Sequence, residues 1–377
     1  MTIAERKEKF RSCSVYRAKE KIDGWIRDHK WTVLLFCCFV MALTTFLKYR
    51  VYEPSGFRDA SNITNLITNG AAMVSDTATG YTFIIFRGID ALTGHMTLVG
   101  WSWFLLIPGM AIFVLIASKS HPKSLEAVLI LIGFSVLLPF YVFMPGVDMI
   151  QYLVFALMAL ILLTVPTQIG KLAASLAVLV PVGLFFREYY FLMVIFAVIL
   201  FVVALLYRRQ KTASQQAIFL MGLAILAILM IFLARIIWPD EIDTLFTVRT
   251  MTNQGIGSAP APNKVILDFL PMERSVPGFL ANYIVAGIRL MCPLELCADI
   301  TDVPFVIFQI LLGVLLIVEL RRSRRVKGRT AVYSLTIAFF LMSFFFEPDF
   351  GSWFRHEAAA FPLLWLGIGH DIGGEKI

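Results

Sequence analysis

The chain has 377 residues, of which 59% are hydrophobic and only 16% are charged. Soluble domains carry about a quarter charged residues, so this composition excludes a soluble globular protein. The net charge of +7 comes mainly from basic segments between apolar runs. We therefore explain the charge by membrane topology and exclude a nucleic-acid-binding surface.

Apolar runs recur along the chain from residue 31 onward. A helix needs about 20 mostly apolar residues to cross a membrane, and the sequence predicts an all-α, polytopic membrane helix bundle of about ten transmembrane helices. The expected spans are residues 31–48, 97–117, 125–143, 150–166, 172–186, 189–206, 215–237, 303–320, 330–346 and 358–370, of which 172–186 and 358–370 are short.

Lysine and arginine predict which loops face the cytoplasm. Basic residues gather before the first span and in every second loop after it, ending with the block from Arg321 to Arg329. We therefore predict a cytoplasmic basic amphipathic segment at residues 1–30, a transmembrane bundle at 31–370 and a cytoplasmic tail at 371–377. The first segment mixes basic and apolar side chains, which is typical of a helix lying on anionic lipid.

The same alternation places two long loops, 49–96 and 238–302, on the external side. Loops of this length are usually functional or disordered, and short apolar stretches within these two favour order. In the first loop, apolar residues follow the spacing of a helix that ends at Thr93-Gly94: Tyr81, Ile84, Ile85, Ile89 and Leu92. In the second, residues 276–291 are too short and polar to span, so we expect a surface or re-entrant helix and, together, an external cap of amphipathic helices.

Cysteine and histidine usage adds little. Cys292 and Cys297 are external and five residues apart, which permits a disulfide in an oxidising compartment but leaves the pairing open. The spacing of cysteines and histidines does not match a zinc site, and we expect neither a metal nor another cofactor.

The last external turn concentrates ionisable side chains between two apolar runs. Its sequence at residues 347–357 is EPDFGSWFRHE, which contains Glu347, Asp349, Arg355, His356 and Glu357. Charged groups at a membrane surface cost solvation energy unless they pair with each other or with a ligand. The cluster therefore predicts a functional site.

Further external ionisable or aromatic residues lie beside the predicted span ends. They are Arg58 and Asp59 in the first loop, Arg187, Glu188 and Tyr189 between the fifth and sixth spans, and Arg235 at the end of the seventh. Each can also serve only as an interfacial anchor. Asp76, Arg87 and Asp90 we expect to form solvated polar faces.

Arginines and carboxylates together suit one kind of reaction. The planar guanidinium matches phosphate and diphosphate oxygens, and a carboxylate or histidine can take a proton from a hydroxyl nucleophile. This combination favours transfer of a sugar from a lipid diphosphate to an alcohol, with arginine stabilising the leaving group. The chain contains neither a GxGxxG nor a GxxxxGK[ST] nucleotide-binding motif.

Two short motifs, Phe186–Tyr190 within FFREYYFL and Pro348–His356, are similar to those of a known family. With the early external loop and its amphipathic helix, the layout resembles the polysaccharide polymerases of the Wzy and EpsG-like type, integral-membrane glycosyltransferases of C-type fold. The resemblance implies that oligosaccharide repeat units carried on undecaprenyl diphosphate are joined at the external face of the bacterial inner membrane. It also implies a partner that regulates chain length, and no metal.

Carried onto this chain, the resemblance implies that Arg187 and Arg355 bind the diphosphate, with Arg58, Tyr189 and Arg235 as further ligands. The base would be Asp59, Glu188, Asp349 or His356, and the sequence leaves that choice open. We expect the three charged turns to form one pocket.

Three other functions remain as alternatives. The long second loop lacks a paired-arginine signature, which leaves open a C-type glycosyltransferase that adds one sugar from a polyprenyl phosphate. A polysaccharide transporter or flippase is disfavoured because the centres of the spans are nearly free of charge. A membrane O-acyltransferase would need His356 deep in a tunnel, whereas the predicted topology places it in an external turn.

Overall fold

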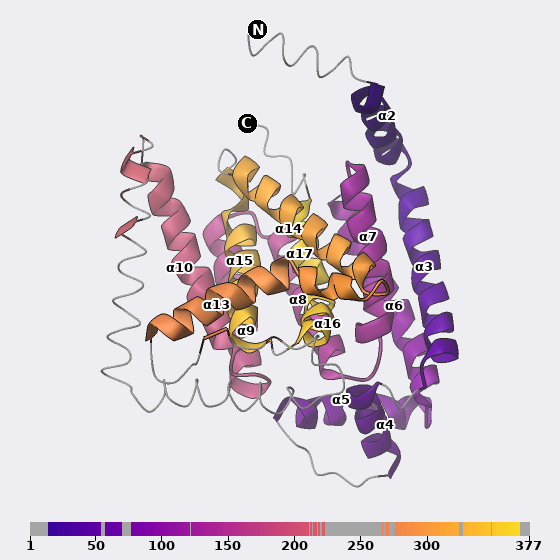
Figure 1. The fold of residues 1–377 in the computed structure, drawn as a ribbon. Helices are drawn as coiled ribbons and strands as arrows, with labels where there is room; N and C mark the ends of the chain where they lie inside the picture. The colour runs from indigo at the N-terminus through magenta and orange to yellow at the C-terminus, as the bar shows by residue number, and fades with distance from the viewer. Residues whose placement is uncertain are drawn as a thin grey trace. The chain divides into compact units, whose positions relative to one another are not determined.

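The computed structural model describes residues 14–53, 57–69, 77–120, 122–210, 276–323, 327–347 and 349–369, with isolated positions between 212 and 222 and at 266, 269 and 270. The regular elements of this part are helices (Figure 1). The chain divides into two compact units. The first comprises Met1–Pro166, Val314–Glu319 and Glu357–Ile377, and the second comprises Thr167–Gly313 and Leu320–His356.

Each unit contains both long apolar helices and short connecting ones. The first holds α2 (Ser14–Asp28), α3 (Lys30–Val51), α4 (Arg58–Asn69), α5 (Thr77–Thr93), α6 (Leu98–Lys119), α7 (Leu125–Leu137), the π-helix η2 (Leu138–Val142), α8 (Val147–Thr164) and α17 (Phe361–Ile368). The second holds α9 (Gln168–Phe185), α10 (Tyr190–Arg209), α13 (Val276–Met291), η4 (Leu294–Ala298), η5 (Lys327–Arg329) and α15 (Thr330–Phe346). Two further helices, α14 (Val303–Ser323) and α16 (Phe350–Ala359), have residues in both.

Seven helices within the described ranges are long and apolar enough to cross a membrane. They are α3, α6, α7 continued by η2, α8, α9, α10 as far as Tyr207 and α14 as far as Arg321. The next apolar helix, α15, is shorter, with 17 residues. These helices confirm the predicted all-α polytopic membrane bundle. The predicted span 215–237 lies almost entirely outside the described residues.

The short run predicted as the tenth span forms two helices instead of one. The second of these, α17, has eight residues and at 1.5 Å per residue is about 12 Å long, too short for a hydrocarbon layer of about 30 Å. All of its side chains are buried. Trp365 Nε1 donates to the Ser120 carbonyl at 2.8 Å, and a Cβ added at Gly369 would lie 1.5 Å from Ser120 Oγ. This segment therefore fills the core of the first unit, where α17 packs against α6 and α8.

The C-terminal end of α3 lies beside the N-terminal end of α6. Tyr49 Oη and Ser102 Oγ are 2.6 Å apart, and the two helices pack against each other. Farther along α6, Gly109 meets the Phe143 ring so closely that an added Cβ would lie 2.4 Å from it. The segment between α3 and α6, which contains α4 and α5, therefore begins and ends at the same membrane face.

The helix predicted near the N-terminus also packs on this unit. Within α2, Lys19 forms an ion pair with Glu126 of α7. The Leu125 backbone N–H donates to Asp23 Oδ1 at 3.0 Å and is one of the N–H groups that the first turn of α7 leaves unpaired. These contacts attach α2 to the start of α7.

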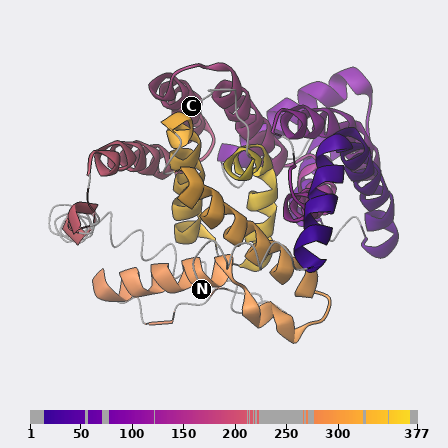
Figure 2. The same ribbon diagram turned by 90° about the horizontal axis from the view of Figure 1, so that it is seen from above.

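In the second unit, α15 packs against α9, α10 and α13. The helix α13 has the predicted bounds, 276–291, and lies across α15 (Figures 1 and 2). Tyr283 Oη of α13 donates to the Leu341 carbonyl at 2.8 Å, and burial raises the pKa of this phenol. An added Cβ at Gly287 would lie 2.8 Å from the Phe344 ring. Close contact of α13 with α15 thus supports the C-terminal part of α15, which leads into the charged turn.

Candidate functional site

The first charged turn of the second unit joins α9 to α10. Its four residues, 186–189, close α9 because the backbone N–H groups of Phe186 and Arg187 both donate to the Val182 carbonyl at 2.9 Å. Gly183 helps the helices approach, since an added Cβ would lie 3.3 Å from the Phe191 ring. Arg187 is therefore held at the ends of two apolar helices, between the spans predicted at residues 172–186 and 189–206.

The second charged turn joins α15 to α16. Asp349 caps α16, because its Oδ1 accepts the Ser352 backbone N–H at 2.8 Å, the usual contact of a helix N-cap. The backbone N–H of Trp353 also donates to the backbone carbonyl of Asp349, at 3.1 Å. Once capped, α16 carries Arg355 and His356 one to two turns from its start. This end of the turn is therefore a rigid helix.

These two turns are in contact. Nδ1 of His356 is 2.6 Å from Oε1 of Glu347, and their side chains are 14% and 4% exposed. On the other side of the ring, Nε2 lies 3.4 Å from Nη1 of Arg187. Arg187 also donates to Tyr189 Oη at 2.6 Å, with the guanidinium 5.5 Å from the centre of that ring. Glu347, His356 and Arg187 therefore form a carboxylate–imidazole–guanidinium chain, which we call the Glu347–His356–Arg187 site, and Tyr189 supports its arginine.

The donors and acceptors of this site define a tautomer. Arginine can only donate hydrogen bonds and a carboxylate can only accept them. We therefore assign the proton of a neutral His356 ring to Nδ1, facing Glu347, and the lone pair to Nε2, facing Arg187. The 3.4 Å contact is long for a hydrogen bond. Nε2 can therefore exchange that contact for a bond to a substrate hydroxyl.

A second feature of Glu347 concerns its other carboxylate oxygen. Its Oε2 is buried and, among the described residues, has no hydrogen-bond partner. Burying a carboxylate oxygen without a partner is costly. Such a cost is common at sites that bind or react, where a ligand supplies the missing contact or the charge is needed.

The other predicted site residues fall into three groups. In the second unit, Glu188 is exposed next to Arg187, and Arg355 is half-buried on α16. In the first unit, Arg58 is the first residue of α4 and Asp59 is exposed beside it. Arg235 lies outside the described residues. Of the three turns expected to form one pocket, the structure brings together those at 187 and 347–356.

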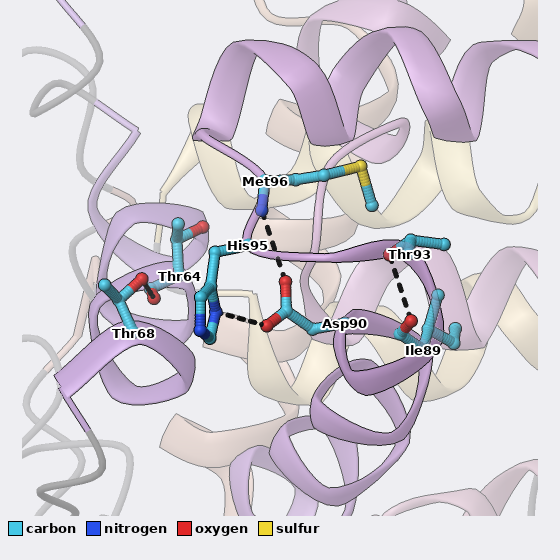
Figure 3. Close-up of polar contacts among 7 residues, drawn as sticks. All are labelled: Thr64, Thr68, Ile89, Asp90, Thr93, His95 and Met96. Carbon is cyan, nitrogen blue, oxygen red and sulfur yellow. Dashed lines mark hydrogen bonds and ion pairs between the residues drawn. The ribbon is translucent and has the colours of Figure 1, made fainter.

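A second histidine–carboxylate pair was not recognised in the sequence. Asp90 of α5 is only 4% exposed, so the expectation that it belongs to a solvated polar face is wrong. Its Oδ2 is 2.9 Å from Nδ1 of His95, and its Oδ1 accepts the Met96 N–H at 3.3 Å (Figure 3). Gly94, with φ of 79°, takes the left-handed conformation that turns the chain back. The pair thus holds the corner between α5 and α6.

Lys48 near the end of α3 was also not singled out. Lysines near span ends commonly extend to water, yet this one is 3% exposed. Its Nζ donates to the Pro139 carbonyl of η2 at 2.6 Å and lies 4.8 and 5.5 Å from the ring centres of Tyr49 and Phe57. These contacts attach the end of α3 to the π-helix.

The structure contains neither a disulfide between Cys292 and Cys297 nor, among the described residues, a group of side chains that could bind a metal. Cys292 and Cys297 are free thiols in this structure. Throughout the described part of the chain, no three histidine, cysteine or acidic side chains are grouped so that they could hold a metal ion.

No protein-family model, curated protein or solved structure matches this chain. The fold nevertheless defines its class, because each unit contains several apolar helices long enough to cross a membrane. The protein is an all-α polytopic membrane protein. Its second unit carries, where α9 meets α10 and α15 meets α16, the Glu347–His356–Arg187 site.

Proposed function

We propose that the protein is a glycosyltransferase that polymerises oligosaccharide repeat units carried on undecaprenyl diphosphate, at the external face of the bacterial inner membrane. The observation that carries this proposal is the Glu347–His356–Arg187 site. It sets a proton acceptor and an anion-binding group 3.4 Å apart, at the ends of apolar helices where a lipid-linked substrate would present its diphosphate.

The chemistry assigns a separate role to each side chain. An acceptor hydroxyl donates its proton to Nε2 of His356 while its oxygen bonds to the anomeric carbon of the donor sugar. The bond from that carbon to the diphosphate oxygen breaks, and undecaprenyl diphosphate leaves with the bonding electrons. Arg187 stabilises the charge that develops on the diphosphate. Glu347, held at 2.6 Å from Nδ1, stabilises the imidazolium that forms, as a carboxylate does in other histidine-based sites.

This assignment selects one base from the four that the sequence left open. His356 is preferred because it is oriented by Glu347 and adjacent to Arg187. Asp349 is engaged as a helix cap, and Glu188 is exposed. Polymerisation, as opposed to transfer of one sugar, rests on the resemblance of the two turn motifs to the Wzy and EpsG-like polymerases.

The test uses the full-length protein in nanodiscs with a lipid-linked repeat unit. The products are undecaprenyl diphosphate, measured by mass spectrometry, and a ladder of polymer lengths on a gel. Arg187→Ala and His356→Ala should abolish both. Arg289→Ala is the matched control, because Arg289 is an arginine of the same unit paired with Glu295 at 2.6 Å.

Each alternative has its own outcome in this assay. Single additions without a ladder would indicate a one-sugar transferase. Movement of the intact lipid between leaflets without release of undecaprenyl diphosphate would indicate a flippase. Normal ladders from both Arg187→Ala and His356→Ala would refute the site.

A further inference from the structure

Two helices between α3 and α6 have opposite surface character. Both lie across the adjoining ends of α3 and α6 (Figure 1), and they pack against each other. In α4 the apolar residues Ala60, Ile63 and Ile67 are buried. Its exposed residues are polar, Asp59, Asn62, Asn65 and Thr68. This is the arrangement of a helix whose outer face meets water.

The neighbouring helix α5 has the opposite pattern, with large apolar side chains on its exposed face. Its buried residues, spaced four apart along one stripe, are Ala78, Thr82, Phe86 and Asp90. The opposite stripe carries large apolar side chains: Tyr81 is 42% exposed, Ile84 63%, Ile85 43% and Leu92 88%. Burying Thr82 and Asp90 while several large apolar side chains face outward would be unfavourable in water.

Contacts on the buried stripe determine which way α5 is turned. The Asp90 carboxylate bonds to both His95 and the Met96 N–H (Figure 3). The Phe86 ring packs edge-on against Trp101 of α6, with ring centres 5.4 Å apart. Rotating α5 to bury its apolar stripe would break these contacts and expose the Phe86 ring. The outward apolar stripe is therefore built into the packing.

The contact with α6 also gives the depth of α5. Trp101 lies in the first turn of α6, a helix of spanning length that begins at Leu98. Four residues separate the end of α5 from that start. The level of α5 is therefore the boundary between headgroups and hydrocarbon, where helices with one apolar face lie in the membrane plane.

The exposed charge next to the stripe fits the same environment. Arg87 is exposed, and its guanidinium lies 5.6 Å from the centre of the Phe83 ring. An arginine beside an aromatic ring at this depth can reach lipid phosphates while its stem covers apolar surface. Tyr81 at the other end of the helix is typical of the membrane interface.

We propose that α5 is an interfacial membrane helix. Its Tyr81–Ile84–Ile85–Leu92 stripe inserts among lipid acyl chains at the face where α3 ends and α6 begins, with Arg87 at the phosphates. The polar outer face of α4 stays in water. This role is independent of the proposed enzymatic activity.

Photocrosslinking of the full-length protein tests the proposal. Benzoylphenylalanine is placed at Ile84 or Leu92, and at Asn65 of α4 as the matched control. All three positions are exposed, so the core is preserved, and size-exclusion chromatography verifies this. Each protein is irradiated in nanodiscs that contain alkyne-tagged phosphatidylcholine, and lipid adducts are read by fluorescence on a gel.

The expected result is several-fold more lipid adduct at Ile84 and Leu92 than at Asn65. Equal lipid adduct at all three positions would overturn the proposal, because the two helices would then share one environment. A crosslinked protein dimer from Ile84 or Leu92, without lipid adduct, would also overturn it. That result would assign the stripe to a second copy of the chain.

Discussion

Glu347 accepts a hydrogen bond from Nδ1 of His356 at 2.6 Å, across the turn that joins α15 to α16. The contact depends on the Asp349 cap, which starts α16 in the direction that returns His356 to Glu347. A carboxylate on one nitrogen of the ring leaves the other nitrogen for substrate. The turn thus orients the imidazole toward Arg187.

The negative charge of Glu347 should matter more than its shape. Glu347→Gln keeps an oxygen that can accept the Nδ1 proton, but it removes the charge that stabilises an imidazolium. We expect kcat to fall by about 10²- to 10⁴-fold, the usual contribution of general base catalysis, with KM nearly unchanged. Steady-state rates of undecaprenyl diphosphate release measure this. A wild-type kcat in Glu347→Gln would show that the charge of Glu347 does not assist the reaction.

The guanidinium geometry of Arg187 should be required in addition to its charge. Lysine cannot present two parallel donors to a diphosphate, so we expect Arg187→Lys to lower kcat/KM by about 10- to 100-fold, equivalent to one charged hydrogen bond of about 1.5–3 kcal/mol. Tyr189→Phe removes the hydroxyl that accepts from Nη1 and should give a smaller loss. Full activity in Arg187→Lys would mean that Arg187 acts only as a positive charge.

Two substitutions of Asp349 distinguish a structural role as a helix cap from a catalytic role as the base. Asp349→Ala removes the cap of α16 and should lower the free energy of unfolding by about 0.5–2 kcal/mol. Asp349→Asn retains a capping oxygen and cannot act as a base. If Asp349 is a cap, the Asn variant keeps both stability and polymer formation. Loss of polymer in a stable Asp349→Asn protein would make Asp349 the base instead.

Two glycines give opposite predictions for the same substitution. Gly109→Ala places a Cβ 2.4 Å from the Phe143 ring, and overpacking of this kind costs about 1–3 kcal/mol. Gly88 has nothing within 4 Å of an added Cβ, so Gly88→Ala should be neutral or stabilise α5 by up to about 1 kcal/mol, the helix preference of alanine over glycine. Thermal unfolding in detergent compares the two. A Tm for Gly109→Ala at or above that of the wild type would contradict the close approach of Phe143.

Much of the fold could be predicted because hydropathy and helical spacing are properties of residues that are neighbours in sequence. The spans from α3 to α10, the bounds of α13 and the end of α5 at Thr93 all follow from apolar runs and from the Thr93-Gly94 boundary. The charged turns at residues 187 and 347–357 were also identified, since few other positions place so many ionisable groups between apolar runs. Each of these features depends on residues that are neighbours in sequence.

The way in which those segments pack, and which of their faces are buried, can be read only from the folded structure. The run at 358–370 is as apolar as a span, yet α17 fills a core because α6 and α8 leave room for eight residues. The residues of α5 follow helical spacing, but only Asp90, His95 and Trp101 determine that its apolar stripe faces outward. Composition also could not distinguish Asp349, which caps α16, from His356, which meets Glu347 and Arg187. Membrane class, helix positions and charged turns follow from the sequence, because transfer energies sum along a segment. The pairing of side chains depends on the rotation and packing of helices distant in sequence, which only the folded chain decides.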